Sequence, residues 1–162
     1  MTNLRAILRA FALILGIFGT TLIVPLAVSW LHRDGARNAY DVTMVIIIAV
    51  AGLLWTATRR HTRELQIKDG FLLVVLTWSV LPAFAALPLM IYFWPQLSFT
   101  DAYFEAMSGI TTTGATVLSG LDALPYSINL WRAELVWLGG MGLIVLAVAI
   151  LPLLGVGGRQ MF

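Results

Sequence analysis

Met107-Ser-Gly-Ile-Thr-Thr-Thr-Gly-Ala-Thr116 lies between two long apolar segments, yet it is too short and too broken to cross a bilayer. Its three consecutive threonines favour extended backbone, because branching at Cβ restricts the χ1 angle. Gly114 permits a positive φ that other residues resist. A capping box at Ser98-Phe-Thr-Asp101 predicts a short amphipathic helix over residues 99–110. A short helix, a Thr-rich strand and a glycine between membrane helices are typical of an ion filter, whose carbonyls replace an ion's hydration shell.

The composition is that of an integral membrane protein. The chain has 162 residues, of which 60% are hydrophobic and 11% are charged, and its mean hydropathy is +0.91. A soluble domain of this size would expose too much apolar surface. There is no cysteine, which excludes a disulfide framework and a thiolate metal site. The basic residues are scattered near segment ends, so no nucleic-acid partner is expected.

Four uncharged runs are long enough to predict membrane-spanning helices, because a bilayer core of roughly 30 Å needs about 20 residues. They cover residues 10–31, 42–58, 70–100 and 135–158. The first run is longer than the apolar part of a signal peptide, which favours a membrane anchor over a cleaved leader. Prolines inside the first and third runs predict bends, at Pro25, Pro82 and Pro88. Residues 121–129 are expected to form a loop.

The basic residues also predict the orientation. An N-terminus in the cytoplasm places seven of them on the inner side (Arg5, Arg9, Arg59, Arg60, Arg63, Lys68 and Arg159) and three on the outer side (Arg33, Arg37 and Arg132). This asymmetry agrees with the positive-inside rule. The predicted fold is therefore an all-α integral membrane protein with four transmembrane helices. A re-entrant pore helix and filter loop, opening at the outer face, lies between the third and fourth.

The sequence Phe99-Thr-Asp-Ala-Tyr-Phe-Glu-Ala-Met-Ser-Gly-Ile-Thr-Thr-Thr-Gly-Ala-Thr-Val-Leu-Ser-Gly-Leu-Asp122 resembles the first pore loop of Trk-type potassium uptake proteins. Trp137-Leu-Gly-Gly-Met-Gly142 and residues 150–158 resemble the inner helix that follows it in the TrkH-like membrane subunits. In that family two leading helices precede four helix/pore-loop/helix repeats, whose filters surround one pore. The resemblance divides the chain into leading helices at 1–69 and a repeat at 70–162, with the filter at 111–116.

The resemblance implies K⁺ as the transported ion and no covalent cofactor. K⁺ would be coordinated at Thr112, Thr113 and Gly114, and Thr111 and Ala115 complete the candidate ion-binding set. The resemblance also implies a bacterial inner membrane, contact with membrane lipid, and a cytoplasmic nucleotide-binding regulatory subunit. The second glycine of fuller potassium-channel filters is replaced by Thr116, a departure that Trk-type proteins share.

Only one such repeat occurs in the chain. Three interpretations follow: a fragment whose remaining pore repeats lie in the same polypeptide, an incomplete module that does not conduct, or a homotetrameric channel of single-repeat chains. An enzyme is not expected, because no nucleophile is spaced with a base.

Several other residues have two interpretations. Glu105, which shares a helix face with Asp101, is either a pore-mouth charge or a structural hydrogen-bonding group. Asp122 is either a mouth charge or a solvated loop residue. Arg132 and Glu134 are expected to be interfacial anchors, and His32 and His61 are too far apart to share a metal. Three glycines are expected to let helices approach closely or to form a hinge: Gly139, Gly140 and Gly142.

Overall fold

The computed structural model describes residues 4–59 and 67–150, without the side chains of residues 67 and 146–150. Its regular elements are all helical within these ranges. Four stretches are long and apolar enough to cross a membrane: Leu4–His32, Arg37–Thr58, Lys68–Tyr92 and Tyr126–Val145. The predicted all-α membrane fold with four candidate spans is therefore confirmed.

The first span consists of two helices, α1 (Leu4–Thr21) and α2 (Ile23–His32). Pro25 explains the interruption, because it has no N–H to donate to the carbonyl of Thr21. The regular bonding resumes at once, with the Leu26 amide 3.0 Å from the Leu22 carbonyl. The expected distortion at Pro25 is thus present as a short break just before it.

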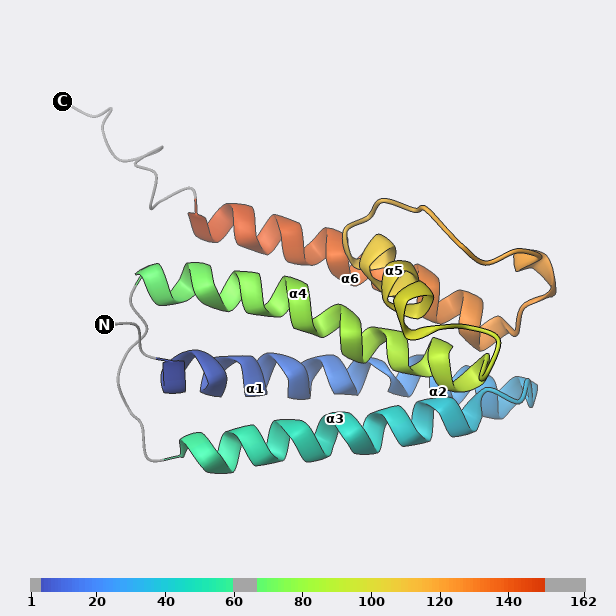
Figure 1. Ribbon diagram of the computed structural model, residues 1–162, viewed down its shortest axis with the longest axis horizontal. Coiled ribbons are helices and arrows are strands. Elements are labelled where there is room, and N and C mark those ends of the chain that lie inside the picture. Colours follow the sequence, from blue (N-terminus) through green and yellow to red (C-terminus); the bar gives the residue numbers. More distant parts are fainter. Residues whose placement is uncertain (1–3, 60–66, 151–162) are drawn as a thin grey trace.

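The long helices run antiparallel to one another in sequence order (Figure 1). Helix α1 packs against α3 (Arg37–Thr58) and α4 (Ile67–Tyr92), which also contact each other. Helix α6 (Tyr126–Ile150) packs on α2, and the short α5 (Phe99–Ile110) contacts both α4 and α6. Figure 1 shows α5 in the half of the bundle that holds α2, so the loop after it lies towards the end where α2 meets α3.

All four spans begin before the expected runs: α1 begins at Leu4 instead of residue 10, and α4 begins at Ile67 instead of residue 70. Helix α3 begins at Arg37 instead of residue 42, and α6 begins at Tyr126 instead of residue 135, so the expected loop over 121–129 is shortened. Only a 3₁₀ turn, η1 (Leu121–Ala123), lies in its first part. The prediction ended each span at the first charge, whereas Arg132 lies inside α6 and forms an ion pair there. The expected final stretch, residues 151–158, lies outside the described residues.

Helix α4 holds its neighbours through carbonyl oxygens near its two prolines. The Trp131 indole Nε1 donates to the Ala85 carbonyl at 3.0 Å, and the Tyr103 hydroxyl donates to the Ser79 carbonyl at 2.9 Å. These acceptors precede Pro88 and Pro82 by three residues. The carbonyls that the two prolines leave without a helical donor are those four residues earlier, at Phe84 and Trp78. The bonds to Ala85 and Ser79 dock α6 and α5 against α4.

Candidate functional site

Helix α5 begins at the predicted cap. The Ser98 hydroxyl accepts the Asp101 amide proton at 3.1 Å and donates to the Asp101 carboxylate at 2.7 Å. Ser98 itself has extended backbone, as an N-cap residue should. The carboxylate thus bonds the serine hydroxyl, where a standard capping box would bond the serine amide. This arrangement fixes the first residue of the helix that leads into the Thr-rich loop.

The far end of α5 is a Schellman turn built from two threonines. The Thr112 amide donates to the Gly109 carbonyl at 2.8 Å, and the Thr113 amide donates to the Ser108 carbonyl at 2.9 Å. Thr112 occupies the left-handed position with φ +57°, where glycine is usual. The expectation that all three threonines are extended is therefore wrong. Closing the free carbonyls at the helix end outweighs the weak β preference of threonine.

The loop after the helix is exposed. Residues 111–117 are all exposed, and Gly114 has φ +76°. Among the bonds between described residues, none reaches the carbonyl oxygens of residues 111–114. Buried carbonyls in folded proteins are almost always paired within the protein or with ordered water. Four consecutive unpaired carbonyls thus leave this loop able to bind a cation or water.

Side chains stabilise the loop from within. The Ser108 hydroxyl donates to the Ala115 carbonyl at 2.6 Å, which leaves that oxygen one free lone pair. The Thr111 hydroxyl donates to the Met107 carbonyl and lies 2.8 Å from the Thr113 hydroxyl. The five predicted ion-binding residues, Thr111 to Ala115, therefore lie on one short exposed turn.

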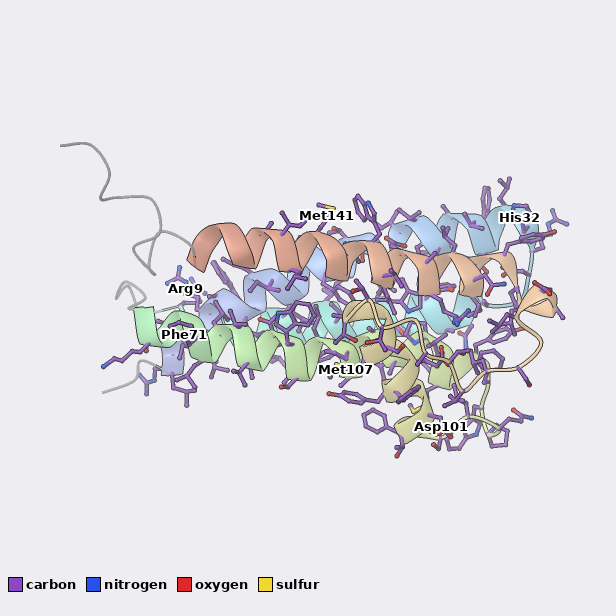
Figure 2. The ribbon with its side chains drawn as sticks, turned by 90° about the horizontal axis from the view of Figure 1, so that it is seen from above. Arg9, His32, Phe71, Asp101, Met107 and Met141 are labelled. Atoms are coloured by element: carbon purple, nitrogen blue, oxygen red, sulfur yellow. The ribbon has the colours of Figure 1, made fainter. Side chains whose placement is uncertain are left out.

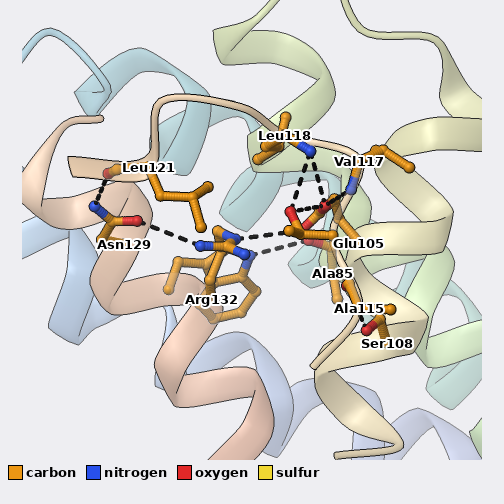
Figure 3. Close-up of polar contacts among 11 residues, drawn as sticks. Ala85, Glu105, Ser108, Ala115, Val117, Leu118, Leu121, Asn129 and Arg132 are labelled. Atoms are coloured by element: carbon orange, nitrogen blue, oxygen red, sulfur yellow. Dashed lines mark hydrogen bonds and ion pairs between the residues drawn. The ribbon is translucent and has the colours of Figure 1, made fainter. Parts of the chain in front are cut away.

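Glu105 lies behind this loop and is bonded on all sides (Figure 3). Its Oε1 accepts from the Thr116 hydroxyl, from the Val117 amide at 2.6 Å and from the Leu118 amide at 3.3 Å. Its Oε2 accepts from the Arg132 guanidinium at 3.2 Å. The Glu105 side chain is 2% exposed. These contacts are those of the structural role considered for Glu105, and they leave its carboxylate closed to solvent.

Arg132, on α6, is the ion-pair partner of Glu105. Its side chain is 22% exposed and pairs with Glu105, while a second guanidinium nitrogen lies 3.4 Å from the Asn129 side-chain oxygen. Arg132 therefore joins α6 to α5 through this ion pair. A buried carboxylate facing it, on α5, is the reason that a charge is accepted there.

The other charged candidates lie apart from this network. Asp122 is exposed on η1, which is compatible with both of its interpretations. His32 packs its ring on Tyr126, with centroids 4.8 Å apart, and it lies at the end of the molecule opposite Arg9 (Figure 2). His61 lies outside the described residues. Within the described ranges no cluster of three metal-ligating side chains occurs.

Sequence reasoning missed Asp34. Its carboxylate accepts from the Ser29 hydroxyl at 2.5 Å, the Ala36 amide at 3.2 Å and the Ser127 amide at 3.0 Å. Burial raises the pKa of Asp34, but these hydrogen bonds outweigh it and the pKa falls below its ordinary value. Nothing in the sequence indicated the contact with Ser127.

Gly139 brings α6 directly against the end of α5. A Cβ at this position would lie 1.8 Å from the Ile110 carbonyl oxygen, whereas one at Gly140 would have an ordinary 3.8 Å contact with Thr112. One at Gly142 would meet nothing within 4 Å. The expected close approach is therefore confirmed at Gly139.

The fold and this loop define a class: an all-helical membrane protein with a short capped helix and an exposed loop between its last two spans. The chain belongs to the TrkH family of cation transport proteins, whose family model matches residues 37–162. It is 49% identical over 160 residues to the Trk system potassium uptake protein TrkH of Salmonella typhimurium, covering 99% of this chain and 33% of that protein. It is 34% identical over 161 residues to the Trk system potassium uptake protein TrkG of Escherichia coli, covering 99% of this chain and 33% of that protein.

A solved structure agrees with this assignment. The crystal structure of the potassium transporter TrkH from Vibrio parahaemolyticus matches with a TM-score of 0.89 at 47% identity, over 98% of this chain and 34% of that chain. The chain thus spans about a third of the length of the relatives it matches.

Proposed function

We propose that this chain supplies one quarter of the pore of a Trk-type potassium uptake system. K⁺ passes along the loop that follows α5 and exchanges part of its hydration shell for oxygens of Thr111, Thr112, Thr113, Gly114 and Ala115. The observation that carries the proposal is a run of exposed residues, 111–114, whose carbonyls accept no hydrogen bond from the described part of the chain. Carbonyl rings of this kind line potassium filters, and the similar proteins are named for potassium uptake. The transport needs no covalent chemistry.

One such loop cannot surround an ion. The remaining oxygens come from further pore repeats, either in the same polypeptide or in further copies of this chain. Large apolar side chains are exposed on α4 and on α6, where they are available to such neighbours or to lipid: Phe71, Leu72, Val75, Leu143, Ile144 and Val145. In this proposal α5 is a re-entrant pore helix, whose C-terminal dipole favours a cation near the loop.

The proposed orientation has the N-terminus in the cytoplasm of a bacterial cell and the loop at the outer face of the inner membrane. The end of the bundle that holds the N-terminus also holds four basic residues, near the ends of α1, α3 and α4: Arg5, Arg9, Arg59 and Lys68. At the opposite end Arg37 pairs with Asp41 and Arg132 pairs with Glu105. Basic residues favour the cytoplasmic side. A cytoplasmic nucleotide-binding regulatory subunit would dock on that side.

The test is a flux measurement on the complete protein that carries these residues, reconstituted in liposomes. Gly114→Ser should lower the ratio of K⁺ to Na⁺ flux, because serine resists φ +76°. Gly120→Ser is the matched control, since Gly120 also has positive φ, +65°, with free space around it, but lies beyond the loop. An unchanged ratio in Gly114→Ser would contradict the proposal.

A second candidate function is an incomplete module that inserts but does not conduct. The limited coverage of the relatives favours it for residues 1–162 taken alone. The mass of the purified 162-residue chain in detergent, combined with its flux, separates the cases. A monomer without flux is the incomplete module, and a tetramer with K⁺ flux is a channel of single-repeat chains.

A further inference from the structure

The candidate filter loop is attached to the bundle at two places. At its start, the Schellman turn holds Thr112 and Thr113 to the end of α5. At its end, three consecutive residues, Thr116 to Leu118, all bond the same carboxylate oxygen of Glu105. Between these points, and among the described residues, one further side chain bonds a loop carbonyl: the Ser108 hydroxyl donates to Ala115.

The Glu105 carboxylate is itself oriented from the opposite side. Arg132 bonds Oε2 and leaves Oε1 for the loop, so the two oxygens have separate tasks. Asn129 bonds the Arg132 guanidinium through its oxygen and donates through its nitrogen to the Leu121 carbonyl at 2.7 Å. Figure 3 shows two branches from α6: Arg132 reaches Val117 and Leu118 through Glu105, and Asn129 bonds the Leu121 carbonyl directly.

We propose that Glu105 is a positioning residue for ion selection: its ionised Oε1 fixes the outer end of the carbonyl loop, and Arg132 holds the carboxylate in the required orientation. This inference rests on the proposed function of the loop and adds the element that sets its geometry. Hydrogen bonds to an ionised acceptor are about twice as strong as neutral ones. A carboxylate with these donors therefore resists the movement of residues 116–118, of which Thr116 and Val117 are exposed.

The inference differs from a simple helix-to-helix ion pair. If Glu105 only holds α5 to α6, exchanging the two charges should preserve its role. If the loop needs an acceptor at position 105, the exchange fails, because arginine has donors only. In the charge-exchanged variant, the amide donors of Val117 and Leu118 would face the guanidinium donors of an arginine instead of an acceptor.

The experiment compares E105Q, the double variant E105R/R132E and T116V with the unmodified complete protein in liposomes. Removing the charge in E105Q weakens three bonds to the loop, and we expect the ratio of K⁺ to Na⁺ flux to fall about five-fold. The KM for K⁺ should rise more than the maximal rate falls. T116V removes one donor and retains the side-chain shape, so its ratio should fall less. E105R/R132E should remain as unselective as E105Q.

Asp41→Asn is the control, since it removes one negative charge from a surface ion pair with Arg37 on α3, away from the loop. Its flux ratio should equal that of the unmodified protein. Amide hydrogen exchange of residues 116–118 provides a readout that does not depend on flux, and it should accelerate in E105Q and T116V.

Selectivity and exchange that stay unchanged in E105Q would overturn the inference, and so would recovery of the ratio in the charge-exchanged variant. Suppose that amide hydrogen exchange accelerates in E105Q and T116V but their ratio of K⁺ to Na⁺ flux does not change. Glu105 is then structural only, and the inference is wrong. Failure of the proposed function itself is separate, because the unmodified protein would then show no K⁺ flux.

Discussion

Within residues 4–59 and 67–150, two residues with positive φ are not glycine, and they lie at different places in the fold. Thr112 has φ +57° in the candidate filter loop, and Arg33 has φ +51° at the end of α2. A left-handed backbone costs roughly 1–2 kcal/mol for residues with a Cβ. Such strain persists where the surroundings hold it, and it is frequent at functional sites. At Thr112 the methyl group, the hydroxyl or the carbonyl orientation is therefore a candidate reason for the strain.

Thr112→Gly should relieve this strain and still damage the loop. Its thermal midpoint in detergent should equal or exceed that of the unmodified protein, because glycine suits the left-handed position of a Schellman turn. Its ratio of K⁺ to Na⁺ flux should fall, because a glycine lets the carbonyls on either side rotate. Thermal unfolding and liposome flux, measured on the same preparation, check both parts.

Arg33→Gly is the matched control for Thr112. It relieves a similar strain at the end of α2, away from the loop, so the midpoint should rise while the flux ratio stays the same. An unchanged ratio in Thr112→Gly would show that threonine at this position is not required for ion discrimination.

Among the elements, α6 comes closest to the loop-bearing helix at one glycine. A Cβ added at Gly139 would overlap the backbone of Ile110, the last residue of α5, at 1.8 Å from its oxygen. Backbone atoms cannot move aside as a flexible side chain can. Any side chain at 139 must therefore push α6 away from α5, together with the turn that α5 carries.

Gly139→Ala should lower the free energy of unfolding by about 2 kcal/mol through overpacking. It should also change the flux ratio, because the turn at residues 110–113 moves with the end of α5. Gly142→Ala is the control, since its Cβ meets nothing within 4 Å and alanine favours the helix. Equal thermal midpoints for the two variants would contradict the observed contact.

The helices could largely be predicted from hydropathy and caps, and their ends could not. Runs without charge locate the spans well, since the bilayer demands about 20 apolar residues. The capping residues Ser98 and Asp101 likewise placed the start of α5 correctly. The prediction failed where a charge is paired inside a helix, as at Arg132, because its partner Glu105 lies 27 residues away. It also failed at Thr112, where the bonding needs of a helix end exceed the residue's own preference.

On the scale of the whole molecule, long-range polar contacts decide how the candidate site is held. The loop residues themselves were predicted from a local pattern of threonines and glycine. Support by Glu105 was one of two interpretations of that residue, but its partner Arg132, 27 positions away, was not predicted. No periodicity or motif records such a pair. A single sequence therefore located the candidate oxygens more readily than the groups that position them.

Asp34 joins three helices at the end of the bundle where α2 meets α3. It bonds Ser29 near the end of α2, the Ala36 amide just before α3, and the Ser127 amide in the first turn of α6. Three donors favour the ionised carboxylate, and its pKa is lowered from the ordinary value of 3.8. A lowered pKa means that the folded state prefers the ionised form more than the unfolded state does.

Asp34→Asn should therefore destabilise the protein in a pH-dependent way. The difference in unfolding free energy between the unmodified protein and Asp34→Asn should be constant between about pH 5 and pH 7, where Asp34 is ionised in both states. It should shrink as the pH falls below 3.8 and through the lower pKa of the folded state. Asp122→Asn replaces an exposed carboxylate in η1. Its unfolding free energy should differ little from that of the unmodified protein throughout this pH range. Denaturant titrations in detergent at several pH values measure this, and a difference that grows towards low pH would show that Asp34 is stabilised in its protonated form instead.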